Sequence, residues 1–205
     1  MDSSAVVLLA KKLGAYSLIV NKNNANVIEF GDTSDRFNIA SIRKCLLGAL
    51  YGIRVAEGKI NISSTLEQLK IDDNDPALTA EEKEATVEDL LKLRSGVYHS
   101  ANYETASAKA DKPQRGSHAH NTFWYYNNWD ANVLGTIYKN LTKKDIFEDF
   151  RKLIAEPIGM EDFDISKCEY KLADENSIHP AYIFRMSVRD LLKFGLLYLN
   201  RGNYG

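Results

Sequence analysis

The sequence predicts an α+β fold in which an antiparallel hairpin precedes a run of helices. The runs 16–20 and 26–30 are rich in β-branched and aromatic residues, and the asparagines of the intervening segment 21–24 tolerate turn conformations. From residue 41 onward, apolar residues recur at steps of three and four, which is the spacing of amphipathic helices. A single hairpin cannot form a stable sheet alone, so we expect either a flap packed on the helices or further strands beyond this sequence.

The helix that begins at Ser41 is expected to be central and largely buried. Its apolar positions follow the helical period, and small residues at 48, 49 and 52 allow close packing. We expect Cys45, on the apolar face, to be a small buried residue. The predicted apolar face consists of Ile42, Cys45, Leu46, Ala49, Leu50 and Ile53.

The remaining segments predict shorter helices and one long loop. Thr86 and Asp89 have the spacing of a capping box at the start of a helix over 86–93, with Gly96 as its stop. Periodicity also predicts helices over 65–69, 144–155 and 187–200, and the end of another over 5–10. Residues 97–121 lack periodicity and predict a long loop, a kind of segment that often carries function.

The charge balance and the apolar runs exclude several classes of partner. The chain has 26 Lys and Arg against 28 Asp and Glu, a formal charge of −2, which predicts no nucleic-acid partner. The run 5–10 is too short to span a bilayer, so we predict no transmembrane segment. The acidic residue before this run and the lysines after it reverse the charge order of a secretory signal. With only Cys45 and Cys168, one disulfide and two free thiols are equally open.

Ser41 and Lys44 form the first motif that carries chemistry. Three residues apart at the start of a helix, the hydroxyl and the amine lie one turn apart on the same face. A neutral lysine there can take the proton of a serine nucleophile, and burial favours the neutral amine. The Ser41 backbone N–H, at the helix N-terminus, can donate to a developing oxyanion. About one such spacing is expected by chance in this composition, so a helix-capping serine beside a coincidental lysine is an equally good interpretation of the motif alone.

The second motif is a cluster of aromatic and amide residues over 123–130. Aromatic runs usually fill a core or an interface, but Asn127, Asn128 and Asp130 are poor core residues. Polar groups beside aromatic walls are typical of a substrate pocket. The triplet Tyr-x-Asn occurs twice here in overlapping registers, and twice more elsewhere, so it is uninformative by itself.

Taken in order, these motifs resemble the landmarks of the penicillin-recognising serine hydrolases, and most closely the class C β-lactamase-related branch with its esterases, D-amino-acid peptidases and 6-aminohexanoate-dimer hydrolase. The resemblance begins near Tyr16 and implies a β-lactamase/transpeptidase-like fold, an antiparallel sheet with a helical lobe. The landmarks are Ser41–Lys44, residues 86–96, residues 122–128 with Leu134-Gly135, Pro157-Ile158-Gly159-Met160, and residues 186–191.

The resemblance implies roles for particular residues. Ser41 would be the nucleophile of an acyl-enzyme mechanism on an ester or amide, and Lys44 its proton-handling partner. The spacing to Gly135 selects Tyr126 as the proton shuttle and Asn128 as the residue that holds the acyl side of the substrate, with Tyr125-x-Asn127 as the second choice of register. Tyr125 and Trp129, together with Trp124, would be aromatic walls of the substrate site. The mechanism needs no metal and no organic cofactor.

Two features depart from the family pattern, and a pair of histidines raises the separate question of a metal site. The family usually has Pro-Gly shortly before the tyrosine, where this chain has His120-Asn121. We expect the third family motif, a Lys or His followed by x-Gly on a C-terminal strand, to be absent after Asn128, with Lys12-Leu13-Gly14, which precedes the serine, as the only Lys-x-Gly. His118 and His120 lack a third ligand at metal-binding spacing, so we predict no metal site.

The missing third motif shapes the expected domain organisation. We expect residues 1–205 to form one serine-hydrolase domain that is incomplete at its C-terminus and that pairs with a complementary C-terminal segment. Within it, 16–30 is the hairpin and 41–200 the mainly helical part. The alternative is a non-catalytic fragment or degenerate paralogue that binds ligand without turnover.

Overall fold

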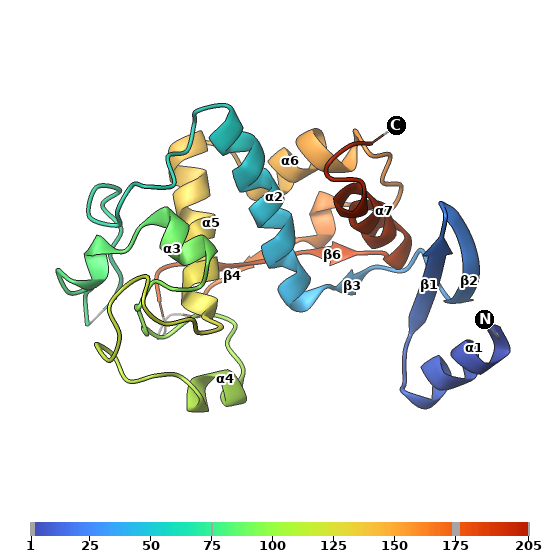
Figure 1. Ribbon diagram of the computed structural model, residues 1–205, viewed down its shortest axis with the longest axis horizontal. Coiled ribbons are helices and arrows are strands. Elements are labelled where there is room, and N and C mark those ends of the chain that lie inside the picture. The colour runs from blue at the N-terminus through green and yellow to red at the C-terminus, as the bar shows by residue number, and fades with distance from the viewer. Residues whose placement is uncertain (1–2, 75, 174–176, 205) are drawn as a thin grey trace. The chain divides into compact units, whose positions relative to one another are not determined.

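The predicted hairpin lies in the first of two units into which the chain divides (Figure 1). In this computed structural model, which describes residues 3–74, 76–173 and 177–204, strands β1 (Ser17–Lys22) and β2 (Ala25–Gly31) pair antiparallel. Asn23 and Asn24, with φ of 53° and 62°, form a two-residue turn that needs two left-handed residues. The hairpin is therefore confirmed, with strands that extend further toward the turn than the sequence predicted.

The first unit combines this hairpin with small elements from the rest of the chain. Helix α1 (Ser3–Lys12) contacts β2, and helix α7 (Val188–Leu199) contacts β1. Strand β3 (Phe37–Asn38) pairs antiparallel with β6 (Arg185–Met186). The unit comprises Met1–Ile39, Arg151–Lys167, which holds a π-helical turn (Arg151–Ala155) and the 3-10 turn Ile165–Lys167, and Phe184–Gly205.

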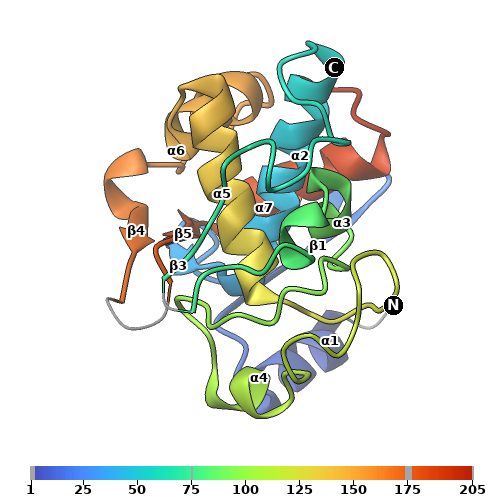
Figure 2. The same cartoon turned by 90° about the vertical axis from the view of Figure 1, so that its left-hand side faces the viewer.

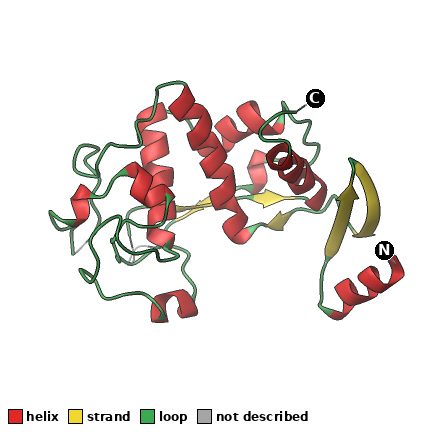
Figure 3. Ribbon diagram, in the orientation of Figure 1, coloured by secondary structure: helices red, strands yellow, loops and turns green. Residues whose placement is uncertain are grey.

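The second unit, Ala40–Phe150 with Cys168–Ile183, is mostly helical and holds the long helices α2 (Arg43–Ala56) and α5 (Asn128–Thr142). Figures 1 and 2 show α2, α3 (Val87–Leu91) and α5 side by side, and α2 contacts α5 and α6 (Ile146–Phe150). A short antiparallel pair, β4 (Glu169–Lys171) and β5 (Ala181–Ile183), completes it (Figure 3). Helices with small antiparallel strands confirm the α+β class.

The core of the second unit lies between α2 and α5. Leu46, Leu47 and Leu50 are almost completely buried, and a Cβ on Gly135 would lie 2.9 Å from the ring of Tyr182, so glycine permits α5 to approach β5 closely. At the C-terminal half of α2, three polar side chains form a buried cluster in which the Tyr138 hydroxyl donates to the Asp149 carboxylate over 2.7 Å and Arg54 bonds both. These contacts fix α2 against its neighbours and hence fix the position of its N-terminal turn.

The buried face of α2 differs from the predicted one. The residues that the structure buries are Arg43, Leu46, Leu47, Leu50, Tyr51 and Arg54. Ile42 is 46% exposed and Cys45 is exposed, so the expectation of a buried Cys45 was wrong. The physical reason is that the guanidinium groups of Arg43 and Arg54 contact polar and aromatic partners inside the unit. The buried face of α2 therefore includes these two arginines and differs from the face that apolar residues alone predict.

Other predicted elements hold with corrections at their bounds. Thr86 and Asp89 form the capping box of α3, but the helix ends at Leu91, because Leu93, with φ of 56°, and not Gly96, is the first left-handed residue. Residues 65–69 form a turn and no helix, since Leu66 N–H donates to Ala85 O instead of to its own segment. The predicted helix over 144–155 is α6 followed by a π turn, and α7 matches its prediction.

Helix α5 is the largest element that the sequence analysis did not predict. The long loop over 97–121 also contains a short helix, α4 (Ala106–Ala110), and a 3-10 turn covers Glu82–Glu84. Within the described residues, no helix is long and apolar enough to cross a membrane.

Candidate active site

Ser41 lies at the exposed entrance to helix α2. It is the middle residue of a 3-10 turn, Ala40–Ile42, that leads directly into α2. The residue before it, Ala40, has a φ of 46°, a left-handed conformation that a residue with a Cβ rarely adopts. Strained backbone of this kind persists where surrounding structure holds it, and it is common at functional sites.

The amine of Lys44 is the centre of the site. Lys44 Nζ lies 3.1 Å from Ser41 Oγ, 2.8 Å from Tyr126 OH and 2.9 Å from Asn128 Oδ1. It also lies 4.5 Å from the centre of the Tyr126 ring. The structure thus brings together four of the six residues that the sequence analysis singled out.

Tyr126 and Asn128 reach Lys44 because the segment before α5 is fixed at several points. Tyr125 N–H donates to Leu93 O over 3.1 Å, which aligns this segment with the chain that leaves α3. Asn127 is the N-cap of α5, and its side-chain amide donates to Val97 O and to Asp130. These bonds use up the hydrogen-bonding capacity of Asn127 in a buried position.

The other two predicted residues lie elsewhere. The Tyr125 hydroxyl donates to Ala108 O over 2.7 Å, so this ring supports helix α4 and does not contact Lys44. Trp129 is fully buried, and its indole N–H donates to Asp73 Oδ2 over 2.6 Å. The structure therefore places Trp129 in the core and not among the groups at Ser41, because its only polar atom already has a buried acceptor.

Burial and neighbouring charges change the acidities at the site. Burial lowers the pKa of the Lys44 amine, and the positive charge of Arg43 lowers it further, against the opposing effect of the hydrogen bond to Tyr126. For Tyr126, burial raises the pKa, but hydrogen bonds to Lys44 and Ser41 outweigh burial, and the net pKa lies below its ordinary value. Both shifts favour a proton that moves easily between these groups.

A cavity of about 500 Å³ opens beside the Ser41 hydroxyl. Tyr125, Tyr126 and Asn128 line this cavity, so Tyr125 is a wall residue of it even though it does not touch Lys44. The predicted long loop contributes Tyr103, Glu104 and residues of helix α4 to the lining. A cavity of this size accommodates a small organic molecule.

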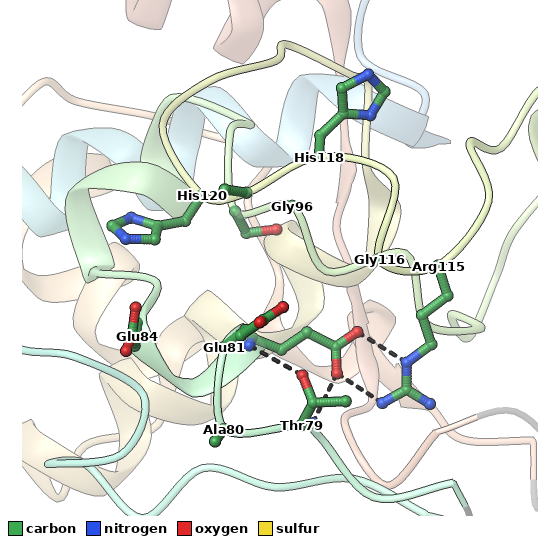
Figure 4. A pocket seen from close by; sticks show the side chains of 12 residues that line it. Thr79, Ala80, Glu81, Glu84, Gly96, Arg115, Gly116, His118 and His120 are labelled. Carbon is green, nitrogen blue, oxygen red and sulfur yellow. Dashed lines mark hydrogen bonds and ion pairs between the residues drawn. The ribbon is translucent and has the colours of Figure 1, made fainter.

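A second cavity of about 1000 Å³ lies beside the chain that enters and leaves α3, and its lining does not include Ser41 (Figure 4). In its lining, Arg115 donates two hydrogen bonds, of 2.8 and 2.6 Å, to the buried carboxylate of Glu82. The imidazole rings of His118 and His120 point in different directions there. His120 instead lies 3.0 Å from Asp89, and no group of three potential metal ligands occurs in the described part of the chain.

The sequence analysis missed one residue that supports this site, Arg43, and overlooked one Lys-x-Gly triplet. Arg43 is buried beside Lys44 and donates to Asn132 of α5 over 3.0 Å. The local sequence carried no signal for Arg43, because its partners Asn132 and Tyr182 lie far away along the chain. The expectation that no Lys-x-Gly follows Asn128 was wrong, because Lys193-Phe194-Gly195 has that pattern. This triplet lies within helix α7 and not on a strand, and Lys193 is bonded to Glu161.

Comparison with known proteins bears on the fold and the family. A putative β-lactamase from Bacteroides dorei superposes with a TM-score of 0.71 at 18% identity, covering 98% of this chain and 64% of that one. A penicillin-binding protein homologue from Pyrococcus abyssi, described as octameric, gives 0.71 at 20% identity, with coverages of 99% and 57%. A putative 6-aminohexanoate-dimer hydrolase from Bacillus anthracis gives 0.69 at 21%, with coverages of 96% and 58%.

These likenesses confirm the predicted β-lactamase/transpeptidase-like fold, and the chain spans 57–64% of the length of these three structures. No curated protein sequence matches the chain. The family model described as Beta-lactamase matches residues 14–205. The ordered motifs and the fold thus agree with a match over almost the whole sequence, and the chain belongs to the beta-lactamase family.

Proposed function

We propose that this protein is a serine hydrolase that forms an acyl-enzyme at Ser41 on a small ester or amide substrate. The observation that carries the proposal is the position of Lys44 Nζ, within hydrogen-bond distance of Ser41 Oγ, Tyr126 OH and Asn128 Oδ1 at once. A nucleophile, its base and a second proton carrier in mutual contact are what acyl transfer without a metal requires.

In the proposed reaction, the neutral Lys44 amine accepts the Ser41 hydroxyl proton as Oγ attacks the carbonyl carbon. The new Oγ–C bond forms while the carbonyl π pair moves onto oxygen, and the Ser41 backbone N–H donates to that oxyanion. The bond from carbon to the leaving group then breaks, and the leaving group takes the proton from Lys44 through Tyr126. Asn128 holds the acyl part of the substrate, and water later cleaves the ester at Ser41 by the reverse sequence of proton transfers.

Intact-mass analysis after exposure to a fluorophosphonate tests this proposal. We expect one adduct per chain in the wild type and none in Ser41→Ala, because that substitution removes the nucleophilic oxygen and little else. A parallel exposure to a penicillin tests whether an amide is also opened. The matched control is Ser63→Ala, which removes an exposed hydroxyl of the same unit. An adduct that persists in Ser41→Ala would assign the chemistry to another residue.

The second candidate function is ligand binding without turnover. The observation that favours it is that, on the strands the structure describes, no Lys-x-Gly or His-x-Gly follows Asn128. The family's third motif supplies one oxyanion donor, and loss of one such donor costs about a hundredfold to a thousandfold in rate. Reversible binding of a small ester, with no hydrolysis product and no adduct at Ser41, would support this alternative over the hydrolase.

A further inference from the structure

Arg43 is a buried cation with no anionic partner in the described residues. It is 2% exposed, and no salt bridge involves it there. The guanidinium donates to the neutral Asn132 amide through Nη2 and lies 4.3 Å from the centre of the Tyr182 ring, while Nη1 is buried without a hydrogen-bond partner. Burying a cation without an anionic partner costs stability, which suggests that this charge has another role.

The position of this charge relative to Lys44 suggests what it does. Arg43 is the neighbour of Lys44 in the first turn of α2 and lines the same cavity as Ser41, Tyr126 and Asn128. A like charge nearby disfavours protonation of an amine, and the positive charge of Arg43 contributes to the lowered pKa values of both Lys44 and Tyr126.

The other influences on the pKa of Lys44 act in both directions: burial lowers it most, and the hydrogen bond to Tyr126 raises it more than Arg43 lowers it. The titratable groups that act on it are Cys45 of its own helix and Tyr126 from the segment before α5. On its other side, Lys44 borders an apolar cavity of about 120 Å³ whose walls come from α3, α5 and β5. Glu104 and Asp111 line the cavity at Ser41, but Glu104 is paired with Lys112 over 2.9 Å.

We propose that Arg43 is a positioning residue of the active site, whose buried positive charge, without an anionic partner, adds to the burial of Lys44 in favouring the neutral amine that accepts the Ser41 proton. This inference rests on the proposed function, because only a general base needs Lys44 to be neutral near pH 7. Asn132 and Tyr182 keep the guanidinium beside α2 without supplying a negative charge, which preserves its effect on Lys44.

The test compares variants that separate charge from shape. Arg43→Met and Arg43→Gln remove the charge, and Gln retains a donor for Asn132, while Arg43→Lys keeps the charge. The titration midpoint of Lys44 is measured by NMR of its ¹³Cε resonance, assigned with Lys44→Arg. We expect the Lys44 midpoint to rise by about one pH unit or more in Arg43→Met and Arg43→Gln, and by much less in Arg43→Lys. Arg94→Met, which changes an exposed arginine of the same unit, is the matched control and leaves the midpoint in place.

The rate of Ser41 labelling by a fluorophosphonate supplies the second readout. Its acid limb moves with the Lys44 midpoint, so at a pH below both midpoints labelling slows about tenfold when the midpoint rises by one pH unit. A Lys44 midpoint that is unchanged in folded Arg43→Gln would overturn the inference and leave Arg43 a purely structural residue. A raised midpoint with no labelling at Ser41 in any variant would instead sustain the role of Arg43 and defeat the proposed function.

Discussion

Replacing Tyr126 by phenylalanine tests whether Lys44 and Tyr126 act as one proton-transfer unit. The change removes the 2.8 Å contact from Lys44 Nζ to Tyr126 OH but keeps the ring beside the amine. A hydrogen bond between neutral groups contributes about 0.5–1.5 kcal/mol. Because Tyr126 is 39% exposed, we take about 1 kcal/mol, which corresponds to roughly a fivefold slower modification of Ser41.

Lys44→Ala removes the base itself, for which we expect a loss of about 10²–10⁴-fold. Since both side chains serve one proton transfer, the double variant Lys44→Ala/Tyr126→Phe should be little slower than Lys44→Ala alone. The assay is the rate constant for fluorophosphonate modification, followed by intact mass at fixed pH. Tyr198→Phe is the control, because Tyr198 belongs to another Tyr-x-Asn triplet at the exposed end of α7. Rate losses that multiply in the double variant would refute the coupling and make Tyr126 a wall residue only.

Two further predictions concern pH. Asn128→Asp places a carboxylate against Lys44 Nζ, which raises the pKa of Lys44, so the acid limb of Ser41 labelling should move to higher pH; an unmoved limb would contradict the 2.9 Å contact. Burial lowers the pKa of His179 below its ordinary value of 6.5, so the unfolded chain binds more protons below about that pH and His179 costs stability as the pH falls. The free energy of unfolding in urea should therefore drop more between pH 7.5 and 5 in the wild type than in His179→Gln, and equal slopes would count against this origin.

Local patterns predicted those parts of the fold whose stabilising contacts are local. The asparagine turn of the hairpin and the box formed by Thr86 and Asp89 are completed by residues within a few positions of each other, so the sequence contains the whole signal. The 65–69 segment was predicted wrongly because its backbone bonds to residues near position 85. Helix α5 was missed because its N-cap and its N-terminal half are rich in polar residues that bond to groups distant in sequence, such as Val97 and Asn102.

In the candidate site, too, local contacts could be predicted from the sequence and long-range contacts could not. The spacing of Ser41 and Lys44 on one helix turn is local, and the structure keeps the two side chains within 3.1 Å. Trp129 could not be assigned from local sequence, because its partner Asp73 lies in a turn far away along the chain. Arg43 was overlooked for a similar reason, since both Asn132 and Tyr182 approach it from elements that follow much later. Ordered landmarks could identify the family without revealing these distant partners.

Asn127 belongs to both overlapping Tyr-x-Asn triplets, and its position explains why Tyr126 and Asn128, and not Tyr125 and Asn127, lie at Lys44. Its backbone is extended, with φ of −96° and ψ of 115°, and successive side chains of an extended segment point to opposite sides. Because the Asn127 amide is held in the core by Val97 O and Asp130, Tyr125 points with it to that side and bonds Ala108 O. Tyr126 is thereby directed to the other side, toward Lys44, where the first turn of α5 also brings Asn128. The buried carboxyl of Asp130, which has no contact with Lys44 among the described interactions, is for this reason part of what positions the proton carrier at the site.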